Sequence, residues 1–433
     1  IRDTFLNFFK ERGHEILPSA SLIPKDDLTL LWNNAGVTPL KKYFDGTMVP
    51  KNKRMTNCQK CIRTSDIESV GDKIHHTFFE MLGNFSIGDY FKKEAIEWSY
   101  ELLTSDKYFG FDKEKLYFTV YKDDEDARNY WISLGVDESH IIKLDGNFWE
   151  IGEGPCGPDS EIFYDRGEKY DQDNIGIKLL QDDIPNERYV EIWNNVFSQY
   201  NSKEGQKRDD YKELPSKNID TGMGLERIVT IIQNKESSYD TDLFSKIIST
   251  IEELTNTKYE NRKDFRIIAD HIRTLTFAIA DGAIFSNEGR GYVLRRLLRR
   301  ASRYGKTFGL NEPFLYKIVN SVVETMGVTY QYLYEKEEQI KDIILKEEKL
   351  FLKTLVSGEK RLIELMNISK DFTISGSDAF KLYDTFGFPF ELTLEMLEEK
   401  GYKVSKEDFD KYMNIQKELA RSSRKQGVSM NIQ

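Results

Sequence analysis

The chain has 433 residues, of which 39% are hydrophobic and 31% charged, an ordinary balance for a globular protein of two or three domains. The net charge of −11 argues against a protein that coats nucleic acid indiscriminately. Three cysteines are too few for a disulfide framework and favour a reducing compartment, so we expect a cytoplasmic protein. No apolar run approaches the roughly 20 residues that a membrane span needs.

The first fifteen residues, "IRDTFLNFFKERGHE", have the spacing of an amphipathic helix and not of a secretory signal. The chain lacks an initiator Met, and its end, "RKQGVSMNIQ", gives no clear stop. We therefore expect a fragment of a longer protein.

Residues 1–240 are predicted to form a mixed domain built on an antiparallel sheet. The stretches "KLYFTVY", "EIFYD" and "RYVEIWNNVFSQY" read as strands. They follow one another too closely for regular parallel βαβ units. The polar stretch 201–218 is expected to be a hairpin or an exposed loop.

Within this domain, "CQKC" and "HHTFFEMLG" place Cys58, Cys61, His75 and His76 in a pattern that resembles a zinc site. We read "HHTFFEML" as a strand, which directs the two histidines to opposite faces, so no zinc is expected. Ordinary packing or hydrogen bonding is the simpler explanation for the histidines. Arg63, at the end of the preceding strand, could hold a phosphate.

The stretch "NIDTGMGLERIVTII" predicts a tight turn framed by Gly222 and Gly224, followed by a helix. A glycine-rich turn before a helix can receive phosphate through backbone N–H groups. The pattern by itself is weak, since it matches neither the P-loop nor the dinucleotide fingerprint. Arg227 adds a fixed cation to the first helical turn.

Residues 241–433 are predicted to be helical, because apolar residues recur at helical spacing over 242–256, 264–282 and 332–366. The last stretch has a core stripe that includes Ile340, Ile344, Phe351 and Leu355. The segment 290–306 carries seven basic residues and no acidic one. Its arginines fall on one helix face: Arg295, Arg296, Arg299, Arg300 and Arg303. With no carboxylate nearby in the sequence, we expect this face to bind phosphate; a solvated helix surface is the alternative.

These stretches together resemble the alanyl-tRNA synthetase family of class II aminoacyl-tRNA synthetases. Arg63 followed by His75-His76-Thr77-Phe78-Phe79 is similar to motif two of that class, and Gly222-Met223-Gly224-Leu225-Glu226-Arg227 is similar to motif three. The strings "NFWEIGEGPCGPDSEIFYD", "ADHIR", "SNEGRGYVLRRLLRRA" and "LYDTFGFP" extend the resemblance over nearly the whole chain. It implies an α+β protein, with a class II adenylation domain (1–240) flanked by helices and then a helical tRNA-recognition domain (241–433).

The resemblance implies an ATP site. Arg63 is expected to bind the α-phosphate and stabilise the transition state, Phe79 to stack on adenine, and Arg227 to hold the far side of the ATP. His75 and Gly224 complete the expected ATP-binding set. Magnesium is expected with the phosphates, with its ligands unassigned.

The resemblance also implies an alanine site. Asp220 is expected to receive the ammonium group and to act with the two arginines as the catalytic set. Asn194 would contact the amino acid, Gly222 would let the backbone approach it, and Trp149 and Val196 would wall a methyl-sized pocket. Alternatively, Trp149 and Val196 are core residues and Asp220 caps a helix.

For the helical half, the resemblance implies recognition of a G·U pair in the acceptor stem of tRNA(Ala) by Asn287 and Asp384. The arginines Arg295, Arg296, Arg299 and Arg300 would contact phosphates. Asp384 could instead be a turn residue.

The implied activity is ligation of L-alanine to tRNA(Ala) through an alanyl-adenylate. Two alternatives are a paralogue that adenylates an amino acid without charging tRNA, and a catalytically dead RNA-binding relative. The loop after Arg63 is short, so the role of a family lysine is absent or passes to Lys73, and Val37 stands where many relatives have Met. We expect no editing domain within this stretch, and the oligomeric state is left open.

Overall fold

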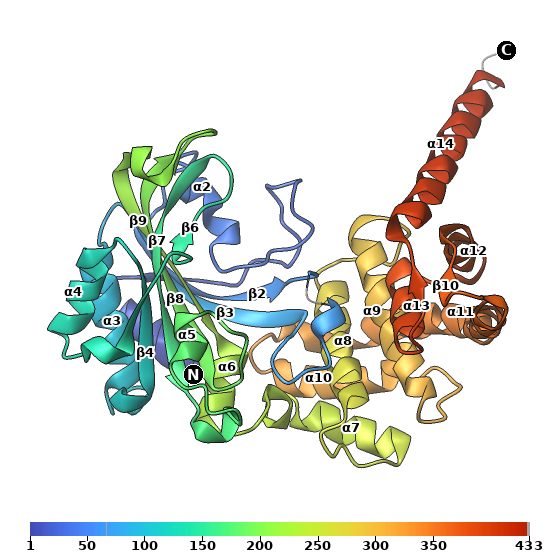
Figure 1. The fold of residues 1–433 in the computed structure, drawn as a ribbon, viewed down its shortest axis with the longest axis horizontal. Helices are drawn as coiled ribbons and strands as arrows, with labels where there is room; N and C mark the ends of the chain where they lie inside the picture. Colours follow the sequence, from blue (N-terminus) through green and yellow to red (C-terminus); the bar gives the residue numbers. More distant parts are fainter. Residues whose placement is uncertain (66, 431–433) are drawn as a thin grey trace. The chain divides into compact units, whose positions relative to one another are not determined.

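The computed structural model describes residues 1–65 and 67–430 (Figure 1). The chain divides into two compact units. Unit 1 comprises residues 1–66 and 73–243, and unit 2 comprises residues 67–72 and 244–433. The short segment Ile67–Asp72, from the loop after Arg63, therefore groups with the helical half of the chain.

Unit 1 is built on a mixed sheet in which antiparallel pairs predominate, as the sequence predicted. Within this sheet, as far as the described residues show it, only the pairs β1–β2 and β4–β5 are parallel. The order across the sheet is β1 (Glu15–Leu17), β2 (Arg54–Ile62), β3 (Phe78–Ile87), β9 (Lys212–Gly224), β8 (Tyr189–Ser202), β7 (Gly154–Asp165), β4 (Leu116–Tyr121) and β5 (Ile141–Leu144), with β6 (Phe148–Trp149) paired to β7. The polar stretch between β8 and β9 closes a hairpin, as expected.

Aromatic residues attach helices to one face of this sheet. Phe5, from α1, packs 5.4 Å from the ring of Trp193 on β8, and Trp131, from α4, packs 4.1 Å from Phe118 on β4. These side chains are almost fully buried, which gives the face a continuous apolar core. The helices of unit 1 are α1 (Arg2–Lys10), α2 (Lys41–Phe44), α3 (Lys92–Thr104), α4 (Glu125–Ser133), α5 (Lys178–Gln181) and α6 (Leu225–Ile232).

Unit 2 is helical apart from a two-residue parallel pair, β10 (Thr373–Ile374) with β11 (Lys403–Val404). Its helices are α7 (Ser245–Thr255), α8 (Lys263–Ala280), α9 (Gly289–Lys306), α10 (Val319–Met326), α11 (Tyr332–Ile368), α12 (Gly376–Phe386), α13 (Phe390–Glu398) and α14 (Lys406–Met430). Every residue of α8 from Phe265 to Ala280 is buried, so this helix is the centre of the unit.

The helical periodicity seen in the sequence corresponds to real packing. The predicted core stripe of α11, from Ile340 to Leu355, is buried to 2% exposure or less. Helix α12 begins at an N-cap, where Ser375 Oγ accepts from the Asp378 N–H at 3.1 Å. It ends at Gly387, whose φ of +67° suits glycine. Within the described ranges, no helix has both the length and the apolarity of a membrane span.

Candidate functional site

The loop between β2 and β3 carries the first set of predicted site residues. Arg63 directly follows β2, and its backbone N–H donates to Thr77 O at 2.9 Å, which closes the base of the loop. The exposed Arg63 guanidinium lies 5.0 Å from the ring centre of Phe79 and donates through Nε to Asn34 O. Arg63 and Phe79 are thus brought together, as predicted.

The histidines are not on a strand, so that part of the sequence prediction was wrong. Strand β3 begins at Phe78, after both histidines. His76 is buried and lies 2.7 Å from Ser238 Oγ, while the backbone carbonyl of His75 accepts from Tyr239 OH at 3.3 Å. The segment 237–239 therefore decides where these histidines lie, and local periodicity could not reveal it.

Cys58 and Cys61 are buried in β2, opposite Leu82 and Phe79 of β3. Burial raises the pKa of both thiols, which keeps them protonated at neutral pH. Over the described residues, no group of three or more His, Cys, Asp or Glu side chains is arranged to hold a metal ion.

The glycines of the third motif lie in an extended strand and not in a tight turn, which corrects the sequence prediction. Gly222 and Gly224 are among the last residues of β9, and α6 begins directly after them at Leu225. Gly222 pairs with Asn194 on β8, and a Cβ at Gly222 would lie 2.7 Å from Met81 Sδ. Glycine therefore preserves a close approach between β9 and β3.

Arg227 lies in the first turn of α6, as predicted. Its Nη1 donates to the backbone carbonyl of Glu191 at 2.9 Å and lies 3.8 Å from the Glu191 carboxylate. The preceding residue, Glu226, is buried and accepts from the Glu80 N–H at 2.9 Å, which ties α6 to β3.

These elements enclose a cavity of about 150 Å³. Six of the residues in its wall belong to the predicted ATP and alanine sets: Arg63, His75, Phe79, Gly222, Gly224 and Arg227. The cavity therefore combines two cations, an aromatic ring and exposed backbone, which are the groups that a nucleotide requires.

Asp220, Gly222, Asn194 and Val196 share one face of the sheet next to this cavity. Val196 is directly opposite Asp220, and Asn194 is directly opposite Gly222. Since side chains two residues apart on a strand point the same way, the four positions form one patch. Asp220 lies inside β9, four residues before the cap of α6, so it does not cap that helix.

Asp220 is half-buried in β9, and removal of its carboxyl group from water raises the pKa from 3.8 to about 7. Among the described residues, none makes an ion pair or a hydrogen bond with this side chain. A carboxylate in that position lacks a positive partner, which a bound ammonium group would supply.

A group of carboxylates on β7 and β8 borders the patch and was not predicted. Burial, and then the charge of Glu191, raises the pKa of Asp159 to about 7. Burial and the charges of Glu191 and Asp159 raise the pKa of Glu161 to about 9. The signal was present in the alternating acidic residues of "GPDSEIFYD", which direct neighbouring carboxylates to one face of β7.

Trp149 and Val196, the two expected pocket walls, lie on different strands. Trp149 lies on β6 and is 40% exposed, while Val196 lies on β8 and is 7% exposed. Strand β7 lies between them, pairing Gly157 with Trp149 and Asp159 with Val196. Val196 is directly opposite Asp220, and the pocket walled by both residues stays a prediction.

In unit 2, the arginine face of α9 is neutralised, so the premise for phosphate binding was wrong. Each arginine meets a carboxylate from a distant part of the chain, and the pairs are Arg295–Glu347, Arg296–Glu68, Arg299–Glu347, Arg300–Glu395 and Arg303–Glu399. Their side chains are 6–21% exposed. Arg295, Arg296, Arg299 and Arg300 are therefore not free cations, and their contact with RNA phosphates stays a prediction.

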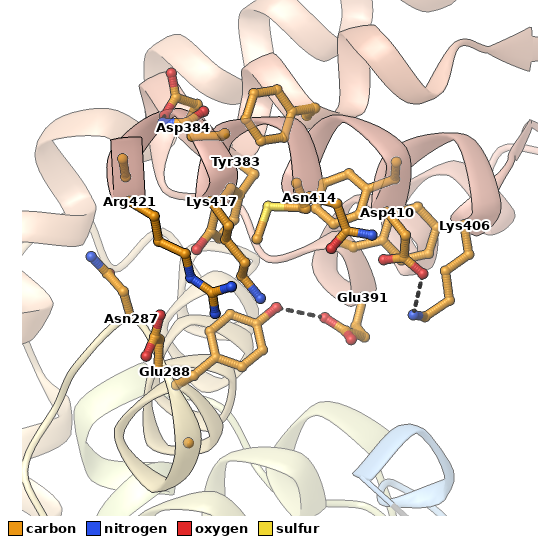
Figure 2. A pocket seen from close by; sticks show the side chains of 18 of the residues that line it. Asn287, Glu288, Tyr383, Asp384, Glu391, Lys406, Asp410, Asn414, Lys417 and Arg421 are labelled. Atoms are coloured by element: carbon orange, nitrogen blue, oxygen red, sulfur yellow. Dashed lines mark hydrogen bonds and ion pairs between the residues drawn. The ribbon is translucent and has the colours of Figure 1, made fainter. Parts of the chain in front are cut away.

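The predicted base-reading residues share a groove of about 960 Å³ in unit 2, shown in Figure 2. Asn287, just before α9, and Asp384, on α12, are both exposed and line it. Asn287 Oδ1 accepts from Arg295, and Asp384 accepts from Gln416 at 3.1 Å. Asp384 lies within α12, so the turn-residue alternative does not hold.

The far wall of the groove is helix α14. Lys417, Arg421 and Arg424 lie at i, i+4 and i+7, and all three line the groove. In Figure 2, Lys417 and Arg421 extend from α14 towards Asn287 and Glu288. No ion pair to these three cations is found among the described residues, in contrast to the arginines of α9.

Comparison with known proteins gives the family. A profile described as tRNA synthetases class II (A) matches residues 1–433. The chain belongs to this family. An Alanine–tRNA ligase of Acholeplasma laidlawii is 57% identical over 431 residues, which cover 99% of this chain and 50% of the relative. An Alanine–tRNA ligase of Streptococcus sanguinis is 54% identical over 440 residues, which cover 100% of this chain and 50% of the relative.

The chain thus spans about half the length of the curated relatives it matches. A solved structure of S. aureus histidyl-tRNA synthetase is 11% identical to this chain, with a TM-score of 0.34. The match covers 53% of this chain and 63% of the histidyl-tRNA synthetase chain, and no conclusion is based on it. Membership of the class II tRNA synthetase (A) family agrees with the mixed, mainly antiparallel sheet of unit 1.

For a class II tRNA synthetase, sequence reasoning missed the cations of α14. The available signal was the helical spacing of the basic residues in "KELARSSRK". Their exposure toward a groove is a property of the packing of α12 and α14.

Proposed function

We propose that this chain activates L-alanine with ATP to alanyl-adenylate and transfers the alanyl group to the 3′ end of tRNA(Ala). The observation that carries the proposal is the half-buried Asp220 carboxyl group, which has no partner among the described residues and lies next to a cavity with two arginines and a phenylalanine. The names of the curated relatives agree with it.

In the proposed alanine site, Asp220 accepts the α-ammonium group. Val196, opposite Asp220 and almost fully buried, offers an apolar surface for the methyl group. Asn194 Oδ1 has no partner in the described part of the chain and faces the same patch, so it is available to the amino acid. Gly222 leaves room that a larger residue would fill.

In the proposed first step, the alanine carboxylate attacks the α-phosphorus of ATP, a P–O bond forms, and the bond to pyrophosphate breaks. Alanine's carboxylate is already ionised, so the step requires positioning and charge stabilisation rather than a strong base. Arg63 would bind the α-phosphate, Phe79 would stack on adenine and Arg227 would hold the far phosphates. In the second step, a ribose hydroxyl of the tRNA attacks the carbonyl carbon and AMP leaves.

The residues present are compatible with magnesium. Burial and the charge of Glu191 raise the pKa of Asp159 and of Glu161, so a cation beside these carboxylates would relieve their repulsion. Mg²⁺ usually takes one or two carboxylates together with substrate phosphates, which does not require a cage of three protein ligands. Glu191, in the cavity wall beside Arg227, would hold it, and the ion would neutralise phosphate charge.

The proposed acceptor-stem site is the groove of Figure 2. Asn287 and Asp384 would contact base edges in the shallow RNA minor groove. Lys417, Arg421 and Arg424 would contact backbone phosphates, in place of the arginines of α9.

Alanine-dependent exchange of pyrophosphate into ATP tests the first step. The expected result is exchange with alanine that is lost in Arg63→Ala. Charging of an acceptor-stem minihelix with a G·U pair tests the second step. Exchange without charging would identify an adenylating paralogue, and RNA binding without exchange would identify a dead relative.

A further inference from the structure

The strand that carries Asp220 and Gly222, β9 of unit 1, is bound unequally to its two neighbours. On the β8 side, every residue from Asp220 to Gly222 has a paired residue opposite it. On the β3 side, pairs form at Asp220 and at Met223, but none forms at Thr221 or Gly222 in the described part of the chain. The backbone ladder between β3 and β9 is therefore open at the residues that the proposed alanine site uses.

Thr221 bridges this opening with its side chain. The backbone N–H of Asn84, on β3, donates to Thr221 Oγ1 at 3.1 Å, and Thr221 Oγ1 donates to Asn84 Oδ1 at 2.6 Å. Both residues are at most 1% exposed. Buried amide groups require such partners, so one hydroxyl group here takes the place of a backbone pair.

Asn84 is itself held by a chain of buried hydrogen bonds. Its Nδ2 donates to Tyr90 OH at 3.0 Å, and Tyr90 OH lies 2.7 Å from His14 Nε2. His14 Nδ1 lies 2.8 Å from Phe9 O on α1. Burial lowers the pKa of His14 to about 4, so the neutral ring donates through Nδ1 and accepts from Tyr90 at Nε2. Each group in the chain then has one role as donor or acceptor, which fixes the orientation of the Asn84 amide.

The Thr221 side chain lies on the face of β9 opposite the proposed alanine site. Side chains alternate along a strand, so Thr221 points away from the face that holds Asp220 and Gly222. Asn195, opposite Thr221 on β8, accepts from Ser99 of α3 at 3.2 Å, so this is the face that α3 covers. The Asp220 carboxyl group has no partner among the described residues, and the backbone of β9 therefore decides where it lies.

We propose that Thr221 is a positioning residue for alanine: its hydroxyl group binds β9 to β3 and fixes Asp220 and Gly222, the residues on either side of it. A displacement of about 1 Å can cost about 100-fold in rate, so a displaced β9 should impair the use of alanine. Arg63 and Phe79 belong to β2 and β3, so the use of ATP should change less. The role in alanine binding rests on the proposed function, whereas the link between the strands does not.

Thr221→Val tests the role of the hydroxyl group, because valine has nearly the same shape as threonine and cannot form these hydrogen bonds. In ATP–pyrophosphate exchange, Thr221→Val should raise the KM for alanine about 10-fold or more and leave the KM for ATP within about twofold of wild type. Thr221→Ser keeps the hydroxyl group and should recover most of the loss. Thr104→Val is the control, since it removes a hydroxyl group that donates to Tyr100 O at 2.6 Å within α3, and it should change neither KM.

Hydrogen exchange measures the link between the strands without substrates. The amides of β9 around Thr221 should exchange faster in Thr221→Val and not in Thr104→Val. If Thr221→Val folds poorly, Tyr90→Phe takes its place, because it removes the hydroxyl group that holds the Asn84 amide. Tyr90→Phe should raise the KM for alanine by a smaller factor and again leave the KM for ATP unchanged.

The possible outcomes are distinct. A lower kcat in Thr221→Val with both KM values unchanged would make Thr221 a merely structural residue and overturn the proposal. Equal losses in Thr221→Val and Thr221→Ser would also overturn it, since the hydroxyl group would then not be the cause. A wild-type chain without alanine-dependent exchange would instead refute the proposed function, and hydrogen exchange would still decide whether Thr221 links the two strands.

Discussion

Replacement of Asp220 by asparagine should stabilise the ligand-free protein at pH 8 while abolishing its use of alanine. The Asp220 carboxyl group is half-buried without a counter-charge among the described residues, and its partial removal from water raises its pKa to about 7. Ionisation is therefore less favourable in the folded chain than in the unfolded chain. Asparagine has nearly the same shape but no charge, so it removes this cost.

The sign and size of the expected change in the free energy of unfolding follow from the pKa of Asp220. Between pH 4 and pH 7 the folded state binds more protons at this position than the unfolded state, so Asp220 lowers the free energy of unfolding as the pH rises. The difference between 3.8 and about 7, at about 1.4 kcal/mol per pH unit, corresponds to about 4 kcal/mol as an upper bound. Below pH 4 both side chains are neutral and the variant should resemble the wild type.

Urea unfolding of both proteins at pH 4.5 and pH 8 measures this difference. Asp209→Asn, at an exposed position between β8 and β9, is the control and should change nothing. Alanine titrations provide the second readout, because an ammonium group restores the missing charge partner. Wild-type affinity for alanine should weaken as the pH falls below about 7, and Asp220→Asn should show no measurable binding.

If Asp220→Asn had a lower free energy of unfolding than the wild type at pH 8, the claim that Asp220 is an unpaired carboxylate removed from water would be refuted. Equal alanine affinity at pH 6 and pH 8 would refute its pairing with the ammonium group.

The other predictions concern phosphate and RNA. Arg63→Ala should lower the rate of ATP–pyrophosphate exchange by about 100-fold or more, which corresponds to about 3 kcal/mol in activation free energy. Arg361→Ala, at an exposed position on α11, is the control. An exchange rate near wild type in Arg63→Ala would exclude Arg63 from the phosphate site. Lys417→Ala and Arg421→Ala should each weaken binding of an acceptor-stem duplex and reduce its salt slope by about one phosphate contact. Lys411 lies on α14 but does not line the groove, so Lys411→Ala should leave RNA binding unchanged. If Lys417→Ala, Arg421→Ala and Lys411→Ala weakened binding equally, the overall charge of the protein, and not the groove, would account for the affinity. Asn287→Ala and Asp384→Ala should reduce discrimination between G·U and G·C duplexes by roughly 1–3 kcal/mol, and unchanged discrimination would leave both as structural residues.

The sequence alone predicted several elements of the chain and six residues in the wall of the 150 Å³ cavity. Helix α11 and strands β4, β7 and β8 follow from periodicity, because the burial of one face imposes a repeat on neighbouring residues. Arg63, Phe79 and Arg227 were found from motif spacing, since each lies at an element boundary that the local sequence marks.

Only the tertiary structure decided what charged residues do. The arginines of α9 looked free because their carboxylate partners, such as Glu68, Glu347 and Glu395, lie 52 to 228 residues away along the chain. The sequence left Asp220 as an ammonium acceptor or a helix cap, and only its place between β3 and β8 raises its pKa. Secondary structure depends on near neighbours in sequence, whereas the energy of a charge depends on solvent exposure and on partners that only folding brings within a few ångströms.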